Sequence, residues 1–444
     1  MSFVHGFDGS SARSETMARG GKRDLTEGPF VWAGGIEDTF VPQARKGQRP
    51  LDEYELMGHY QHWREDLALA PEAGLTALRW GIPWYRVETA PGEFDWRWVD
   101  QVVTHAVDHL NLTLIADLVH YGCPLWLRGG FANPAYPSAV ASFAAAFAER
   151  YRGMVRWFTP LNEPLITAEM CGKRGLWPPY LRGFRGYARL MMQLVDGIAG
   201  TIDAIRQIDP DAVIVHVEAA GVSHASHPDL EPLRAHDELV RYLATDLLTG
   251  RVDPDHPLFS WLLRLGVSHH DLARRQQRAV APDLLGLNFY PQWSSHQLYL
   301  DKSGRVRSRL VDREGSGFAG MLEAYYRRFA IPLMVTETSA HGSDEERAGW
   351  LRASLGAVRA LRLAGIPVVG YTWFPLFTMI DWRYRYGRRA LGDYRLELGL
   401  YRLGDEGRRW HSTPLVDSFR ACTGNAEREV GVLGSTPEDA RAAG

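Results

Sequence analysis

The chain has 444 residues, of which 45% are hydrophobic and 23% are charged, an ordinary globular composition. Its formal net charge of −3 is close to neutral, which argues against a global field that recruits nucleic acid or an anionic membrane surface. No apolar run approaches the ~18 residues that a membrane-spanning helix requires.

The two ends of the chain read differently from the middle. Residues 1–28 form a polar arm without the apolar core of a secretory signal, and residues 424–444 are small, polar and aperiodic, so we expect this tail to be disordered. Between them, residues 29–423 show no linker and are predicted to form one domain. The cysteines, Cys123, Cys171 and Cys422, are too few and too widely spaced for a disulfide framework or a metal site, which favours a cytoplasmic protein.

Short β-branched or apolar runs recur along this middle region, each bounded by turn residues. They predict eight strands within 30–35, 75–82, 112–120, 155–164, 212–220, 284–291, 333–339 and 368–374.

Amphipathic segments separate several of these strands. Residues 139–154 place Val140, Phe143, Ala144 and Phe147 on one face, and residues 189–208 and 345–365 repeat the pattern, with Gly365 suited to end the last helix. Strand–helix alternation repeated eight times predicts an α/β fold, a single (β/α)8 TIM barrel. The interval from residue 219 to residue 282 is long for one βα unit and is expected to carry an elaborated surface loop.

Polar residues follow the predicted strands at their C-terminal ends, where the active sites of such barrels lie. Burying charges is costly unless they are paired, so a ring of them at one rim indicates a site. In strand order the candidates are Glu37 and Asp38, Arg79, His120, Asn162 and Glu163, Glu218, Asn288 and Tyr290, Glu337, and Trp373.

Two of these carboxylates, Glu163 and Glu337, follow strands four and seven and so face each other across the barrel mouth. A pair of carboxyl groups roughly 5 Å apart can cleave a glycosidic bond with retention, one attacking the anomeric carbon and the other protonating the leaving oxygen. The two groups must then differ in pKa, and a neighbouring arginine such as Arg79 can separate them. No metal ion or organic cofactor is implied.

Six segments in order resemble glycoside hydrolase family 1, the retaining β-glycosidases. They are LRWGIPWYRVETAPG, LVHYGCPLWL, FTPLNEP, DLLGLNFYP, LMVTETS and GYTWFPLFTMIDW, within a similarity that runs from Phe30 to about Phe419. The resemblance implies Glu163 as acid/base and Glu337 as nucleophile. It also implies that Asn162 binds the sugar 2-hydroxyl and that Arg79 and Tyr290 hold Glu337. By the same resemblance Asn288 belongs to the supporting set, His120 meets the 3-hydroxyl and Trp373 stacks under the sugar ring.

The chain also departs from that family's usual pattern. Glu37 is the best substitute for a glutamine that clamps two sugar hydroxyls, and Tyr121-Gly122 replaces a Trp-Asp pair. The C-terminal segment ends in Asp381-Trp382 rather than Glu-Trp, with one extra residue after Trp373. We therefore predict an intact catalytic centre with altered glycone recognition through Glu37, Asp381 and Trp382.

Several alternatives remain open at this point. The same intermediate could pass to a sugar or natural-product hydroxyl, as in a transglycosidase, or the chain could bind a sugar without catalysis. Arg383, Arg385, Arg388 and Arg389 could form a 6-phosphate site, although a solvated loop is the simpler interpretation. The expected partner is a small-molecule β-glycoside or oligosaccharide, with no nucleic acid or membrane, and a homo-oligomer is left open.

Overall fold

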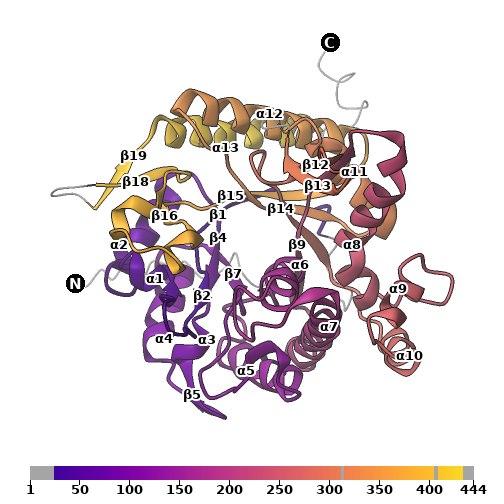
Figure 1. Ribbon diagram of the computed structural model, residues 1–444. Coiled ribbons are helices and arrows are strands. Elements are labelled where there is room, and N and C mark those ends of the chain that lie inside the picture. Colours follow the sequence, from indigo (N-terminus) through magenta and orange to yellow (C-terminus); the bar gives the residue numbers. More distant parts are fainter. Residues whose placement is uncertain (1–24, 312–314, 405–408, 434–444) are drawn as a thin grey trace, which may run out of the picture.

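The computed structural model describes residues 25–311, 315–404 and 409–433. Parallel strands close into a barrel at its centre, with helices around it, so the predicted (β/α)8 barrel is confirmed (Figure 1). In chain order the barrel strands are β1 (Val31–Gly35), β4 (Ala77–Gly81), β7 (Thr113–Asp117), β8 (Trp157–Thr159), β9 (Val213–Ala219), β11 (Leu284–Asn288), β14 (Leu333–Thr338) and β15 (Val368–Trp373).

The longer helices cover the outside of this barrel, and α12 and α13 lie side by side, as do α5 and α7 (Figure 1). The helices are α1 (Glu53–Leu56), α2 (His59–Glu72), α3 (Trp84–Val87), α4 (Arg97–Thr104), α5 (Tyr136–Arg150), α6 (Pro164–Thr167), α7 (Gly183–Ile208), α8 (Glu231–Leu248), α9 (Phe259–Arg264), α10 (His269–Gln277), α11 (Phe318–Phe329), α12 (Asp344–Leu363) and α13 (Pro414–Leu433). None of the helices in the described ranges combines the length and apolar character that a membrane crossing requires.

Short strands decorate the loops between these elements. They are β2 (Phe40–Val41), β3 (Leu51–Asp52), β5 (Glu88–Ala90), β6 (Glu93–Phe94), β10 (Val222–Ala225), β12 (Ser295–Leu300), β13 (Val306–Leu310), β16 (Met379–Ile380), β17 (Arg395–Leu396), β18 (Tyr401–Leu403) and β19 (Trp410–Ser412).

Local sequence explains where the predicted helices start and stop. The side chain of Ser343 accepts from the Glu346 backbone while Glu346 reaches back to Ser343, which forms a capping box at the start of α12. After this helix Gly365 adopts a φ of +83°, the left-handed conformation that ends helices, as predicted.

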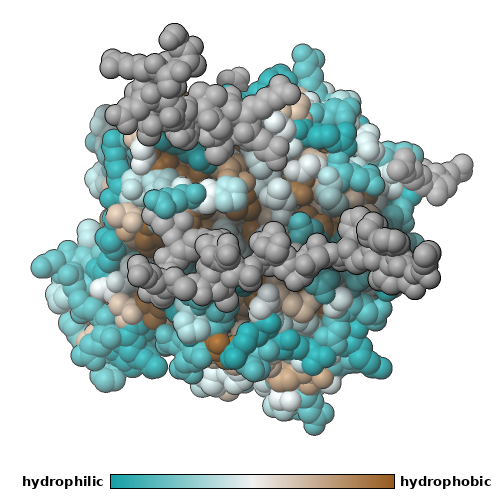
Figure 2. Space-filling model, turned by 180° about the vertical axis from the view of Figure 1, so that it is seen from behind, coloured by the Kyte–Doolittle hydropathy of each residue, from teal (hydrophilic) through white to brown (hydrophobic). Residues whose placement is uncertain are grey.

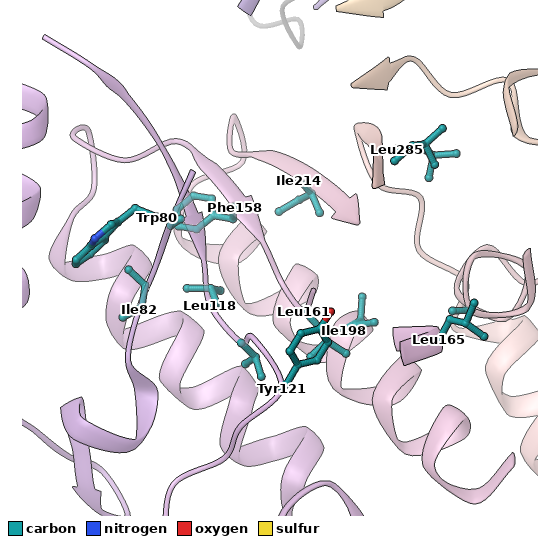
Figure 3. Packing of buried hydrophobic residues seen from close by; sticks show 14 of the residues in the cluster. Trp80, Ile82, Leu118, Tyr121, Phe158, Leu161, Leu165, Ile198, Ile214 and Leu285 are labelled. Atoms are coloured by element: carbon teal, nitrogen blue, oxygen red, sulfur yellow. The ribbon is translucent and has the colours of Figure 1, made fainter. Parts of the chain in front are cut away.

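Two apolar layers hold the barrel together. Mostly small and β-branched side chains fill its interior, among them Ala33, Ile115, Val215 and Val217. A larger layer lies between the strands and the helices and includes Trp80, Phe158, Ile198, Ile214 and Leu285 (Figure 3). On the face shown in Figure 2, hydrophilic residues cover most of the surface and hydrophobic residues lie in recesses between them.

Two expectations about the periphery need correction. The interval from residue 219 to residue 282 is not mainly loop, because it holds β10, α8, α9 and α10. At the C-terminus, α13 crosses the predicted domain boundary at residue 423 and continues to Leu433, so residues 424–433 of the tail are helical. The rest of that tail and residues 1–24 of the N-terminal arm lie outside the described residues.

Candidate active site

Glu163 is displayed by the abrupt end of β8. The strand stops at Thr159, and the backbone amides of Asn162 and Glu163 then donate to the carbonyls of Val119 (2.9 Å) and Val217 (3.2 Å) on the neighbouring strands' ends. Glu163 has a φ of +46°, and Pro164 follows as the first residue of α6. A left-handed non-glycine residue is strained, and such strain is concentrated at functional sites. This backbone turn therefore directs the Glu163 carboxyl toward the barrel mouth.

Glu337 lies in β14 and is held by two donors. Arg79 Nη1 from β4 donates to Glu337 Oε1, and the Tyr290 hydroxyl donates to Oε2 at 2.6 Å. The predicted contacts of Arg79 and Tyr290 with Glu337 are both present. A guanidinium and a phenol that grip the two oxygens fix the orientation of the carboxylate.

Glu163 is also held at both oxygens, but by neutral groups. Asn288 Nδ2 donates to Oε1 at 2.9 Å, and the Tyr121 hydroxyl donates to Oε2. Burial raises the pKa of Glu163 to about 7, and the nearby Glu337 carboxylate adds to that rise. The two carboxyls thus sit in unlike surroundings, as the pairing in the sequence predicts.

The Arg79 guanidinium links Glu337 to the neighbouring polar side chains of the site. Besides Glu337 it donates to Asp117 and, through Nη2, to Asn162 Oδ1 at 2.7 Å. Because a guanidinium can only donate, the Asn162 atom that faces it is the oxygen. The Asn162 nitrogen then lies 2.9 Å from both His120 Nε2 and the Tyr121 hydroxyl.

All of the hydrogen-bonding groups of Asn162 are thus engaged by protein. Its oxygen also accepts from Asn288 at 3.2 Å, and the side chain is fully buried. This arrangement argues against the predicted direct contact between Asn162 and a sugar 2-hydroxyl.

His120 belongs to a buried cluster with Asp38 and Asp117. Its Nδ1 lies 2.9 Å from Asp38 Oδ1 and 3.1 Å from Asp117 Oδ2, while Nε2 accepts from Asn162. These three side chains are close enough to share a cation. However, Arg79 already neutralises Asp117 and the Nδ1 proton of His120 lies between the two carboxyls, so we interpret the group as an ion-paired scaffold.

A cavity of about 720 Å³ opens over these groups. Glu163 and Glu337 line it together with His120, Asn288, Tyr290 and the three residues predicted to read the glycone, namely Glu37, Asp381 and Trp382. Away from the carboxyls the wall is largely apolar, with Leu165, Ile166, Met170, Leu176, Met379 and Leu396. This size and lining suit a small ligand with one polar and one apolar end.

The three residues proposed to recognise the glycone differ in the hydrogen-bond partners that the protein already gives them. Glu37 Oε1 accepts from Thr39 N (3.1 Å) and Thr39 Oγ1 (2.5 Å), and burial raises the pKa of the Glu37 carboxyl. Asp381 accepts from the backbone and side chain of Arg383. Trp382 packs against Tyr121 and Trp177, and among the described residues its buried indole nitrogen has no hydrogen-bond partner.

The prediction for Trp373 is wrong. Trp373 is fully buried in the outer apolar layer, and its Nε1 donates to the Leu398 carbonyl at 3.0 Å, so no face is available to a sugar. The aromatic ring that faces inward at the end of β15 is Phe374, whose centroid lies 5.4 Å from the Arg79 guanidinium carbon. If Phe374 takes the aromatic position, the extra residue before Asp381 disappears.

Two other sequence candidates lie away from the cavity. Glu218 accepts from Thr245 at 2.7 Å and lies 3.1 Å from His216, so it joins β9 to α8. Arg385 is fully buried and donates to the carbonyls of Val41, Gln43 and Arg49, which is a structural role.

The sequence reasoning missed three contributors to the site. Asp117 carries a charge inside an apolar run three residues before His120, a signal that could have been read. Tyr121 was noted only as a departure from a pattern, although it directly follows His120. Thr336, whose hydroxyl donates to Asn288 Oδ1 at 2.7 Å, gave no signal because a threonine is ordinary in a strand.

Comparison with known proteins identifies similar chains. Residues 32–253 match the family model described as glycosyl hydrolase family 1. Beta-glucosidase A of Thermotoga maritima is 22% identical over 373 residues, which cover 74% of this chain and 80% of that protein. An aryl-phospho-beta-D-glucosidase of Bacillus subtilis is 23% identical over 388 residues, covering 75% of this chain and 80% of its own.

A solved structure of a family 1 β-glucosidase from Thermotoga maritima, in complex with isofagomine lactam, aligns with a TM-score of 0.77. It is 18% identical, and the alignment covers 89% of this chain and 98% of the other. The likeness establishes that the two share a fold.

Proposed function

Since the chain belongs to glycosyl hydrolase family 1 and is therefore a glycoside hydrolase, we propose that it cleaves a β-O-glycoside with retention. In this proposal Glu337 is the nucleophile and Glu163 the general acid and base. The observation that carries the assignment is that both carboxyls line one cavity, while their partners differ in charge. A panel of aryl β-glycosides that differ only in glycone, assayed for release of the aryl group, tests the activity directly.

In the first step Glu337 attacks the anomeric carbon while Glu163 gives its proton to the glycosidic oxygen, which leaves with the aglycone. Arg79 and Tyr290 hold the attacking carboxylate in place. The raised pKa of Glu163 supports this role, because a general acid must carry its proton near neutral pH.

In the second step water attacks the glycosyl ester and passes a proton to Glu163. Esterification removes the charge of Glu337, and that charge is one cause of the raised pKa of Glu163. The pKa of Glu163 therefore falls in the intermediate, which suits a group that must now act as a base. The two inversions return the β configuration.

The pH dependence of turnover follows from the pKa of Glu163. Below about 7 the carboxyl is protonated and can act as an acid, and above about 7 it loses the proton. We expect kcat/KM for an alkyl glycoside to fall about tenfold per pH unit above pH 7. An aryl glycoside whose leaving group needs no proton should fall less steeply. A rate for the alkyl substrate that stays flat from pH 7 to 9 would contradict the assignment.

We also propose that glycone choice depends on Glu37, Asp381 and Trp382. These residues line the cavity, and Glu37 and Asp381 are where the sequence departs from its family's pattern. Trp382 Nε1 is buried and has no hydrogen-bond partner among the described residues, so a sugar oxygen that reached it would supply the missing acceptor.

An aryl β-glucoside is expected to be a poorer substrate than another β-glycoside, such as one lacking or epimerised at the 4- or 6-position. Each misplaced hydroxyl should cost about tenfold to hundredfold in kcat/KM, because a buried polar group is left unpaired. Asp381→Ala should change the ranking of the panel, whereas Asp393→Ala, an exposed residue of the same segment, should not. The idea fails if the unmodified β-glucoside is the best substrate and Asp381→Ala preserves the ranking.

Assays with the same substrates also separate the alternative functions from hydrolysis of an unmodified β-glycoside. The apolar wall beyond the carboxyls could admit a natural-product alcohol instead of water, and product analysis with added alcohol would detect transglycosylation.

A 6-phosphoglycoside preference is suggested by the Bacillus subtilis relative. Of the four arginines considered for it, Arg385 is committed to backbone carbonyls and Arg383 is paired with Asp381. A sugar-binding protein without catalysis would release no aryl group in this assay. The cytoplasmic location and a homo-oligomeric state remain predictions.

A further inference from the structure

Tyr121 lies between the two polar residues that end β8. Its hydroxyl donates to Glu163 Oε2 and accepts from Asn162 Nδ2, which is 2.9 Å away. Asn162 in turn is oriented by Arg79, so a chain of hydrogen bonds runs from the guanidinium to the carboxyl of Glu163. The phenol reaches only one of the Glu163 oxygens, and Asn288 holds the other.

The Tyr121 ring is fixed on several sides. It packs edge-on against His120, with centroids 4.6 Å apart, and contacts Trp177 at 5.1 Å and Trp382 at 5.3 Å. The side chain is 2% exposed and lies at the edge of the outer apolar layer (Figure 3). Its backbone has a φ of +72°, a conformation that a tyrosine rarely adopts without a compensating constraint.

The next residue supplies part of that constraint. A Cβ at Gly122 would collide with the carbonyl oxygen of Phe40, so the chain passes this point only with glycine. The Phe40 amide also donates to the His120 carbonyl at 3.0 Å. The segment that carries Tyr121 is thus bound to Phe40 of β2, which limits how far the phenol can move.

We propose that Tyr121 is a positioning residue for Glu163, whose phenol fixes the plane of that carboxyl and favours its ionised form. The inference rests on the proposed function, in which Glu163 is the acid and base. With one donor on each oxygen, rotation of the carboxyl is restrained, and a remaining lone-pair position can carry the proton that is donated to the glycosidic oxygen or accept one from water in the cavity.

The phenol also works against the groups that raise the pKa of Glu163. Burial and the charge of Glu337 raise it, whereas the hydrogen bonds from Tyr121 and Asn288 lower it. Burial also raises the pKa of Tyr121 itself well above its usual value, so the hydroxyl keeps its proton and remains a donor. Besides Tyr121, the titratable or charged groups around Glu163 and its cavity include His120, Tyr290, Glu337, Glu37, Arg174 and Arg241.

Tyr121→Phe keeps the ring and removes only the hydroxyl, so the pKa of Glu163 should rise. We expect the alkaline limb of the kcat/KM profile for an alkyl glycoside to move up by about one to two pH units. Tyr187→Phe is the matched control, because it deletes another buried hydroxyl that has no hydrogen-bond partner in the described part of the chain and lies on α7. The control should leave the limb unchanged.

A direct titration separates failure of this inference from failure of the proposed function. The carbon-13 resonance of the Glu163 carboxyl, assigned by its loss in Glu163→Gln, should titrate at higher pH in Tyr121→Phe. If the titration moves but the rate limb does not, Glu163 is not the acid. If neither moves, the inference about Tyr121 is overturned. Should Tyr121→Phe fail to fold, a ring-fluorinated tyrosine at position 121, as a stronger donor, should move both downward.

Discussion

Glu337→Ala is expected to lower kcat by on the order of 10⁴-fold or more, because it removes the carboxylate that is proposed to form the covalent intermediate. Removing the carboxyl leaves a cavity beside Arg79 and Tyr290, which donated to it. Azide can enter that space and attack the anomeric carbon from the nucleophile's face. Added azide should therefore restore turnover and yield a glycosyl azide of inverted, α configuration.

Glu345→Ala serves as the control for this experiment, because Glu345 is exposed in the first turn of α12 and close in sequence. It should keep the wild-type rate with and without azide. A Glu337→Ala enzyme that retained wild-type turnover, or that gave a β-glycosyl azide, would remove Glu337 from the role of nucleophile.

Glu163→Ala is expected to act selectively on substrates that need a proton. For an alkyl glycoside, kcat/KM should fall by on the order of 10²–10⁴-fold, whereas a glycoside with an activated aryl leaving group should lose much less in this first step. Azide can here replace water in the second step without a general base, so it should accelerate turnover and give a product of retained, β configuration. The opposite stereochemistry from Glu337→Ala distinguishes the two carboxyls.

Glu149→Ala, at the exposed end of α5, is a suitable control because it removes a carboxyl remote from the cavity. Equal losses for alkyl and activated aryl substrates in Glu163→Ala would show that the mutation damages the site generally rather than removing an acid.

The barrel was predictable because its strands are buried on both faces and so appear as short apolar runs. The rule that the C-terminal ends of the strands converge at one rim then brought Arg79, Tyr290 and Glu337 together. These three make the contacts that the sequence predicts, since each lies in a barrel strand or within two residues of its C-terminal end. Glu163 also lines the cavity, displayed by the turn that precedes Pro164.

Side-chain direction at irregular strand ends was not predictable. The pairing of β14 with β15 shifts register between Val335 and Thr338, and a shift of one residue reverses which side chains face inward. On β15 the alternation is regular at this end, so Trp373 lies in the outer apolar layer with Tyr371, two residues before it, and the ring of Phe374 lies near Arg79. The position of Tyr121 depends on a positive φ and on a contact with Phe40 from a distant segment, neither of which appears in the local pattern.

The hydrogen-bond partners of the polar side chains could not be predicted from the sequence either. Asn162 could have been directed at a ligand or at protein groups, and the choice depends on where Arg79, His120, Tyr121 and Asn288 lie in space. In the same way Glu218 follows a strand as the site residues do, but it points outward to Thr245 of α8.

The most direct test of double displacement at Glu337 is the configuration of the first sugar released, followed by proton NMR before mutarotation mixes the anomers. With the best glycoside of the panel as substrate, the β anomer should appear first and the α anomer only later, as the free sugar equilibrates. The first appearance of the α anomer would mean a single displacement by water, and would contradict the assignment of Glu337 as nucleophile.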